Sequence, residues 1–514
     1  MLTPDAIYQH ETSGLTTPVD VNPLISASRI FSCQAGPVKH SDCSSTSTME
    51  IPTASPGSFA DVDLDKTPFI EWSPYYLLLL LIYPFAVALL RHDRLRTTLE
   101  TFPYTDRRSF ASMTDNDAFL IQQKISELEF PFTFEKALQF ALFRTYGIPS
   151  ISKLLVATAQ FSEEATSCKR YTDTEVLIQE FIGHAPASGR TLEAISRMNY
   201  IHSGYQKSGK ISNDDMLYTL SLFAVEPIRW IDRYEWRTLE AFEKCAIGTF
   251  WKSLGDAMGI SYENLSSAND GWVDGLQWLE EIEAWGEDYE KKYMVPHPSN
   301  KKTADQTVNI LLWKVPKPLK PAGQKTVHAL MDDRLRKAMM YATLILPPTY
   351  HHIPNQTLTH LHPHLPPHHY PTLTPTRYPT PPPLYTHFTH NLLALRGFLL
   401  RHLFLPRPSF LPSHHLSTHP SPNGTYYALK FPAAPYYVKP TLWQRWGPMA
   451  WVNWTMGLPL PGDEGGKYWP GGYRIGEIGP TRVLGKGEGE MKVGVEGLRG
   501  RRTGGCVFGV VKRQ

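Results

Sequence analysis

The chain has 514 residues and a formal net charge of +2, from 51 Lys and Arg against 49 Asp and Glu residues. This near balance excludes the basic surface that a nucleic-acid-binding protein needs, so we expect no nucleic-acid partner. A hydrophobic fraction of 42% suffices for a sizeable core and excludes a wholly disordered chain. The five cysteines form no CxxC motif, which predicts reduced thiols rather than a disulfide framework.

The N-terminal part of the chain divides into a leader and an apolar segment. Residues 1–71 are rich in Ser, Thr and Pro and lack periodicity, which predicts a disordered leader. Residues 72–91 are uncharged up to Arg91, a length typical of a transmembrane helix. Acidic residues precede this segment, and Arg91, Arg94 and Arg96 follow it. Because the positive flank faces the cytosol, we expect a single-pass membrane protein whose larger C-terminal part is cytosolic.

Residues 92–346 are expected to form a helical domain, because apolar residues recur there at helical spacing. Thr191 is expected to cap one helix. Ser212 and Asp215 form a capping box that begins the next helix, which Pro227 is expected to interrupt. Alternation typical of strands is scarce, so the predicted fold class is all-α. Further helices are expected over residues 239–259, 272–289 and 324–346.

Two C-terminal segments differ from this domain in composition. Pro, His and Thr dominate residues 347–390, which predicts a low-complexity insertion that does not fold alone. The histidines of this insertion leave a zinc or copper site open as an alternative. Residues 391–514 begin with a helical pattern and become rich in Trp, Tyr, Gly and Pro, so we expect an extension that packs on the helical domain. Its Gly-rich run over 479–497 lacks the residue order of a phosphate-binding P-loop.

One histidine of the helical domain is distinguished by its position. His202 lies in the middle of a predicted helix, on an apolar stripe, whereas His184, His297 and His328 lie in turns or near helix ends. An axial haem ligand needs a neutral imidazole that projects from a rigid helix into an apolar slot. His202 meets that requirement, and the same pattern fits a core histidine with a structural role.

Several segments resemble the family of ER-bound oxygenase MpaB and rubber oxygenase, the latex-clearing proteins. Three of them are RTYGIPSISKLLVATAQF (144–161), RMNYIHSGYQKSGKISNDDMLYTLSLFAVEPIRWI (197–231) and AFEKCAIGTFWKSLGDAMGI (241–260). Later segments, LWQRWG (442–447) and GLPLPGDEGGKYWPGGYRI (457–475), resemble the fungal MpaB-like branch. The resemblance covers about residues 72–345 and 391–490.

This resemblance implies a cofactor, a reaction and a location. It implies haem b in a globin-like helical bundle, with His202 in the place of the iron ligand and Arg197 ahead of it in the cofactor site. It also implies that dioxygen cleaves a carbon–carbon double bond of a prenyl or other isoprenoid chain on a hydrophobic small molecule. The implied location is the endoplasmic reticulum membrane, whose lipid would surround the predicted anchor.

The resemblance also gives candidate catalytic residues. Thr158 matches the threonine that the family places on the distal side of the haem. Lys153 is a candidate for a positive charge there, and Glu135 for a base that removes an allylic proton. A packing role for Thr158 and a solvated helix charge for Glu135 remain open.

Three other functions remain open from the sequence. One is a haem protein that senses oxygen or carries electrons without turnover. Another is a membrane scaffold without haem. The third is a non-haem iron oxygenase, which would require His184 and a carboxylate to converge with His202.

Overall fold

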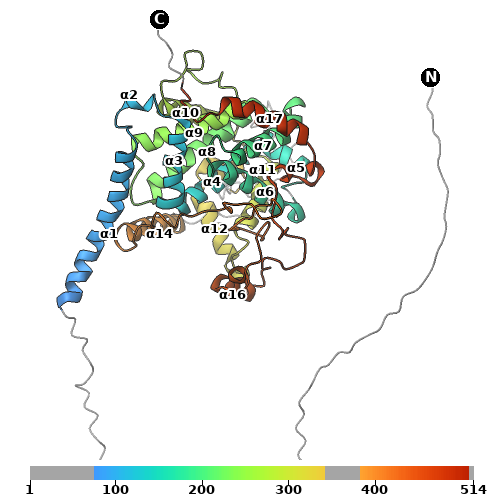
Figure 1. Ribbon diagram of the computed structural model, residues 1–514. Coiled ribbons are helices and arrows are strands. Elements are labelled where there is room, and N and C mark those ends of the chain that lie inside the picture. Colours follow the sequence, from blue (N-terminus) through green and yellow to red (C-terminus); the bar gives the residue numbers. More distant parts are fainter. Residues whose placement is uncertain (1–73, 162, 342–382, 509–514) are drawn as a thin grey trace, which may run out of the picture. The chain divides into compact units, whose positions relative to one another are not determined.

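The computed structural model describes residues 74–161, 163–341 and 383–508 (Figure 1). Over these ranges the chain forms helices joined by turns and loops, and it contains no β-strand. Extended segments meet in isolated bridges, such as the one between Tyr426 and Tyr473. The predicted all-α class is therefore confirmed. The predicted leader and residues 347–382 of the predicted insertion lie outside the described residues.

The helices lie in two stretches of chain. The first contains α1 (Pro74–Thr101), α2 (Arg107–Phe110), α3 (Asp115–Gln123), the π-helix η2 (Lys124–Glu129), α4 (Pro131–Thr145), α5 (Pro149–Ala157), α6 (Glu164–Ile182), α7 (Gly189–Lys207), α8 (Asn213–Tyr234), α9 (Ala241–Ala257), α10 (Gly275–Tyr293), α11 (Pro298–Leu311), η3 (Lys317–Leu319), α12 (Lys320–Leu330) and α13 (Asp333–Ala338). The second contains α14 (Pro383–His402), α15 (Leu442–Trp446), α16 (Pro448–Thr455), η6 (Ile475–Glu477), η7 (Thr481–Val483) and α17 (Glu488–Arg501).

The main core is built around α8, which is buried along most of its length. This helix packs against α4 and α10, and α9 packs against α3 and α10. Helices α9 and α10 cross closely, because a Cβ atom on Gly248 would lie 2.1 Å from the carbonyl oxygen of Gly275. Helix α4 is tied to α10 by a buried ion pair in which Arg144 Nε lies 2.6 Å from Glu290 Oε1.

A second, smaller core joins α6 and α7 to the C-terminal segment. The Tyr437 hydroxyl donates to Asp173 of α6 at 2.7 Å, and the Tyr473 hydroxyl donates to Glu180 of the same helix at 2.6 Å. Helix α17 packs along α7, and α14 packs against α1, α8 and α12. The C-terminal segment therefore covers faces of the central helices that would otherwise be exposed.

Two helix boundaries differ from the sequence prediction. The cap of α7 is Ser188, whose hydroxyl accepts the N–H of Thr191 at 3.3 Å, so Thr191 lies inside the first turn. Pro227 does not interrupt α8, which continues to Tyr234. A proline removes one backbone hydrogen bond, but burial of the surrounding turns holds the helix together.

The structure also differs from the sequence prediction near the ends of the stretches. The helix expected over 324–346 is divided, because Asp332 caps the start of α13 by accepting the N–H of Leu335 at 2.8 Å. Residues 342–346 lie outside the described residues. The Gly-rich run over 479–497 contains the first turns of α17, which begins after Gly487 in the left-handed region at φ 84°. Residues 383–390 of the expected insertion form the first turns of α14.

None of the helices in the described ranges is long and apolar enough to cross a membrane. The transmembrane helix predicted over 72–91 is therefore not found; residues 72 and 73 lie outside the described residues. The apolar stretch of α1 passes within the same helix into a charged half that begins at Arg91. Arg91 Nη2 donates to the carbonyl of Phe404 at 2.7 Å, beyond the end of α14. The orientation predicted from the arginines stays a prediction.

Candidate functional site: a cavity beside His202

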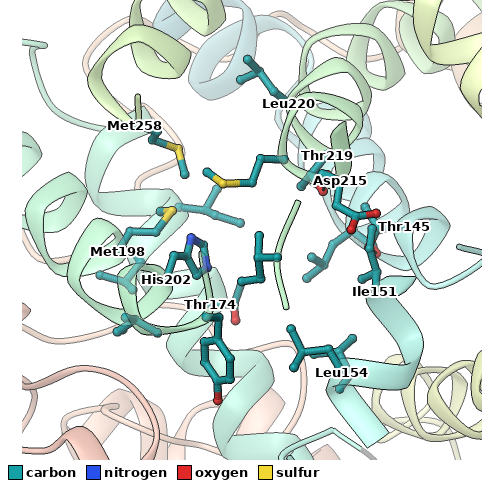
Figure 2. Close-up of a pocket in the computed structure, with 18 of the residues that line it drawn as sticks. Thr145, Ile151, Leu154, Thr174, Met198, His202, Asp215, Thr219, Leu220 and Met258 are labelled. Carbon is teal, nitrogen blue, oxygen red and sulfur yellow. Dashed lines mark hydrogen bonds between the residues drawn. The ribbon is translucent and has the colours of Figure 1, made fainter. Parts of the chain in front are cut away.

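A cavity of about 250 Å³ lies among α4 to α9 (Figure 2). Leu, Ile, Phe and Met side chains make up most of its wall, so it suits an apolar ligand. Figure 2 shows the His202 ring on one side of the cavity and Ile151 and Leu154 on the opposite side. The polar residues of the lining are Thr145, Tyr146, Thr158, Gln160, Arg170, Thr174, His202, Tyr205, Lys210, Asp215 and Thr219.

Helical spacing explains how α7 contributes to the wall. Met198, Ile201, His202 and Tyr205 occupy one face of this helix at positions i, i+3, i+4 and i+7, and all four line the cavity. Because α7 is held by α6 on one side and α17 on the other, the imidazole projects from a fixed backbone.

The His202 side chain is half-buried, because it faces the cavity. Its Nδ1 atom is fully buried and has no hydrogen-bond partner among the described residues. Burial, with a smaller effect of the positive charge of Arg170, lowers the pKa of His202 to about 4. The ring is therefore neutral at pH 7 and keeps a lone pair available for a metal ion.

Two cations line the cavity together with His202. Arg170 lies on α6 and donates from Nη1 to the Thr174 hydroxyl at 2.7 Å. Desolvation lowers the pKa of Arg170, with the positive charge of Arg482 acting in the same direction. Lys210 follows the end of α7. These cations add positive charge to the lining of an apolar cavity, which suits a ligand with both apolar and acidic parts.

Asp215 is the acidic residue of the lining, and its carboxylate is occupied by neighbours. Its Oδ1 accepts hydrogen bonds from the hydroxyls of Ser150 at 2.6 Å and Tyr289 at 3.0 Å. Its Oδ2 accepts from Ser212 at 2.8 Å. We infer that Asp215 ties α5, α8 and α10 together at the edge of the cavity.

Arg197 lies outside the lining and supports the wall from behind. Its side chain is fully buried and donates to three carbonyls of the C-terminal segment: Ile478 at 2.7 Å, Lys486 at 2.8 Å and Val483 at 2.9 Å. Between these carbonyls lies Pro480, which lines the cavity. The structure therefore places Arg197 one layer behind the cavity, where it positions this loop.

The three candidate catalytic residues lie in different places. Thr158 lines the cavity at the end of α5, and its hydroxyl donates to the carbonyl of Leu155 at 3.1 Å. Lys153 is exposed on the same helix and does not line the cavity. Glu135 also lies away from the cavity, where it accepts from Lys136 at 3.2 Å and from Gln139 at 3.1 Å. Of these three, the structure brings only Thr158 together with His202.

Sequence reasoning missed both cations of the lining, Arg170 and Lys210, and the signal for Arg170 was the clearer one. From sequence alone, a single charged residue on a helix is usually taken to face solvent, because the side chains around it in the fold are not known. The signal available was the apolar face of α6, on which Arg170 falls in line with Thr174, Leu177 and Ile178 at spacings of four, three and one. A charge within such a face indicates either a buried partner or a ligand.

The convergence that a non-haem iron centre requires is not seen. His184 does not line the cavity, and its Nδ1 lies 2.9 Å from the carbonyl oxygen of Glu180. Among the residues that the structure describes, no group of three or more His, Cys, Asp or Glu side chains is arranged to hold a metal ion.

The cavity residues fit a haem group. His202 supplies a neutral imidazole with an unpartnered ring nitrogen, and the apolar wall suits a porphyrin. Arg170 and Lys210 are cations of the kind that pair with the two carboxylates of haem b.

No protein-family model matches the chain. Curated relatives do match it. ER-bound oxygenase mpaB′ of Penicillium brevicompactum is 46% identical over 438 residues, which is 85% of this chain and 95% of the relative. ER-bound oxygenase mpaB of the same organism is 42% identical over 402 residues, or 78% of this chain and 87% of the relative. The mpaB protein of Penicillium roqueforti (strain FM164) is 52% identical over 271 residues, or 53% of this chain and 91% of the relative. The resemblance inferred from the sequence segments is thereby confirmed, and the chain belongs to the family of the ER-bound oxygenase MpaB.

Proposed function

We propose that this protein is an oxygenase of the endoplasmic reticulum membrane that uses haem b and dioxygen to cleave a carbon–carbon double bond in a prenyl or other isoprenoid chain. The names of the curated relatives, which call them ER-bound oxygenases, support the oxygenase activity and the association with the endoplasmic reticulum. One structural observation carries the haem part of the proposal: the neutral imidazole of His202, with an unpartnered Nδ1, faces an apolar cavity.

The residues of the chain have distinct roles in this proposal. His202 would hold the haem iron, and Arg170 and Lys210 would pair with the haem carboxylates. When bound, haem supplies the site at which dioxygen is held and activated. Arg197 would keep the loop that carries Pro480 closed against the cavity.

The apolar wall would bind the substrate. Leu154, Leu155 and Ile178 line the cavity, and such side chains hold an isoprenoid chain by excluding water from it. Thr158 is the distal candidate that lines the same space, and its hydroxyl could turn from the Leu155 carbonyl toward a bound ligand. In the overall reaction, one double bond and one dioxygen molecule give two carbonyl groups, each with one oxygen atom.

The test combines absorbance spectroscopy with product analysis on the full chain. We expect the wild-type protein to show a Soret band and His202→Ala to lose it. His328→Ala is the matched control, because burial also lowers the pKa of His328 to about 4, yet this residue does not line the cavity. Incubation of the wild type with farnesol under ¹⁸O₂ should give labelled carbonyl products.

Other outcomes would assign another function. A Soret band without oxygen consumption on any prenyl alcohol would indicate a sensor or an electron carrier. Folded protein without a Soret band would indicate a scaffold that lacks haem. Retention of haem by His202→Ala would remove His202 as the iron ligand.

A further inference from the structure

The hairpin of α15 and α16 exposes an unusual density of large apolar side chains. The two short helices pack against each other at the lower side of the helical body in Figure 1. Leu442 is 81% exposed and Trp443 is 74% exposed. The remaining exposed apolar residues of the hairpin are Trp446, Met449, Trp451, Val452 and Trp454. A patch of this kind on a folded protein marks a surface that another body covers.

The hairpin carries few charges to compensate for this apolar surface. Residues 446–462 contain no Asp, Glu, Lys or Arg. The one charged residue within the helices, Arg445, is 36% exposed and is paired: its Nη1 donates to the carbonyl of Pro461 at 2.6 Å and lies 3.0 Å from Asp463 Oδ1. The ion pair thus consolidates the base of the hairpin, while its outer surface stays apolar.

The tryptophans of the hairpin contact one another and stay exposed at its surface. The indole N–H of Trp451 donates to the carbonyl of Trp446 at 3.1 Å. The ring of Trp451 lies 6.2 Å from that of Trp446 and 5.9 Å from that of Trp454, centroid to centroid. An indole combines a large apolar face with one polar N–H, a chemistry that favours the boundary between water and lipid tails.

The surroundings of the hairpin fit a lipid surface. Lys439 is exposed a few residues before α15, where its ammonium could reach lipid phosphates. A second row of exposed apolar side chains lies on α14 and the chain after it. The exposed residues of this row are Leu384, Phe388, Leu392, Leu395, Phe398, Leu403, Phe404, Leu405, Phe410 and Leu411.

We propose that the α15–α16 hairpin docks into the headgroup and upper acyl region of a phospholipid bilayer. The inference rests on the membrane location in the proposed function, and it assigns a surface that meets the membrane. The uncharged stretch over 446–462 and its indoles favour a lipid surface over a protein partner, because a protein interface sets its apolar centre within a charged and polar rim. Docking here would hold the cavity at the membrane, from which an isoprenoid substrate must come.

The test measures which tryptophans enter the bilayer. The full chain is mixed with phosphatidylcholine vesicles, with and without bromine on the acyl chains, and tryptophan emission is recorded. Four of the 13 tryptophans lie on the hairpin, so bromine should remove up to about a third of the emission if all residues emit equally. Replacement of these four tryptophans by phenylalanine should abolish that loss. Trp285→Phe on α10 is the control that should leave it unchanged.

The outcomes separate docking from the other proposals. Vesicle flotation without bromine quenching of the hairpin would overturn hairpin docking and leave membrane association intact. Absence of flotation would overturn both. A second variant, with the four tryptophans replaced by serine, distinguishes a protein interface: if it converts a dimer into a monomer without any bromine quenching, a second copy covers the surface. A Soret band in the same samples reports the haem site independently, so colourless protein with hairpin quenching would overturn only the haem proposal.

Discussion

At the scale of single residues, His202 makes the folded state sensitive to acid. Its pKa is about 4 in the folded protein against 6.5 as a free side chain. Between these values the unfolded state binds more protons, so the free energy of unfolding is highest above pH 6.5 and decreases as the pH falls toward 4. The difference of 2.5 units corresponds to at most about 3 kcal/mol for this one group.

Denaturant unfolding of haem-free protein would measure this effect. We expect the stability of the wild type to fall from pH 7 to pH 4.5 more steeply than that of His202→Leu, because the variant lacks the titrating ring. Parallel pH profiles of the two proteins would show that His202 is not held neutral by the fold.

Arg170 and Lys153 offer a second test at this scale, because only Arg170 lines the cavity. If Arg170 pairs with a haem carboxylate, Arg170→Leu should weaken haem binding about tenfold or more, since a charge-assisted hydrogen bond contributes about 1.5–3 kcal/mol. Arg170→Lys should recover part of this loss, and Lys153→Leu should bind like the wild type. Haem titration followed by absorbance would measure the affinities, and equal losses in both leucine variants would contradict the assignment.

His202 could be found from the sequence, whereas the placement of the other candidate residues could not. His202 could be predicted as a candidate because its position in an apolar stripe is a local property of one helix. The separation of Thr158 from Lys153 and Glu135 depends on which faces of α4 and α5 turn toward the cavity, and tertiary packing decides that. Arg197 is the same kind of case, because its three carbonyl partners lie about 280 residues further along the chain.

At the scale of elements, the crossing of α9 and α10 depends on the absence of side chains. A Cβ on Gly248 would meet the backbone oxygen of Gly275 at 2.1 Å, and backbone cannot move aside as a side-chain end can. Gly248→Ala should therefore force the helices apart and lower the free energy of unfolding by about 2 kcal/mol or more.

The matched control is Gly204→Ala. Gly204 lies in α7, and a Cβ there would have no neighbour within 4 Å. This variant should be as stable as the wild type or more stable by up to about 1 kcal/mol, because alanine favours a helix over glycine. Thermal unfolding followed by circular dichroism would compare the three proteins. A loss of stability in both variants would show that replacing a helical glycine is destabilising in general, and that the close crossing of α9 and α10 is not the cause.

Elements were predicted well in type and less well in their ends. Helical periodicity identified helices such as α8, α9 and α10, because each buries one apolar face. The positions where these helices begin and end depend on which residue takes the cap and on tertiary packing, and the local pattern does not decide either. Ser188 precedes Thr191 and takes the capping position, Asp332 divides a long periodic segment, and packing carries α8 through Pro227. Helix α17 escaped prediction because its glycines lower local helix propensity while its contact with α7 supplies the stabilisation.

At the scale of the whole molecule, the two stretches of chain interlock. The smaller core contains Val176 and Ala194 from the first stretch and Tyr437, Tyr473 and Ile478 from the second. Composition could predict that the C-terminal segment packs on the helical domain, because it is rich in aromatic residues. It could not predict that the segment forms part of the support of the cavity, since that contact spans the two stretches.

Expression of the protein as two separate chains would test whether this interlocking holds the molecule together. A cut between residues 361 and 362 lies outside the described residues, so it leaves the helices of both stretches whole. Residues 1–361 and 362–514, expressed together, should co-purify at a one-to-one ratio, because the smaller core and the packing of α14 against α1, α8 and α12 join them.

The split protein should also keep any haem that the intact chain binds. When the fragments associate, the Arg197 guanidinium regains the carbonyls of Ile478, Val483 and Lys486, and the loop that carries Pro480 returns to the cavity wall. Arg197→Met in the first fragment should accordingly weaken co-purification, whereas Lys153→Met should not. Fragments that separate freely would show that the C-terminal segment only covers the helical domain and does not complete it.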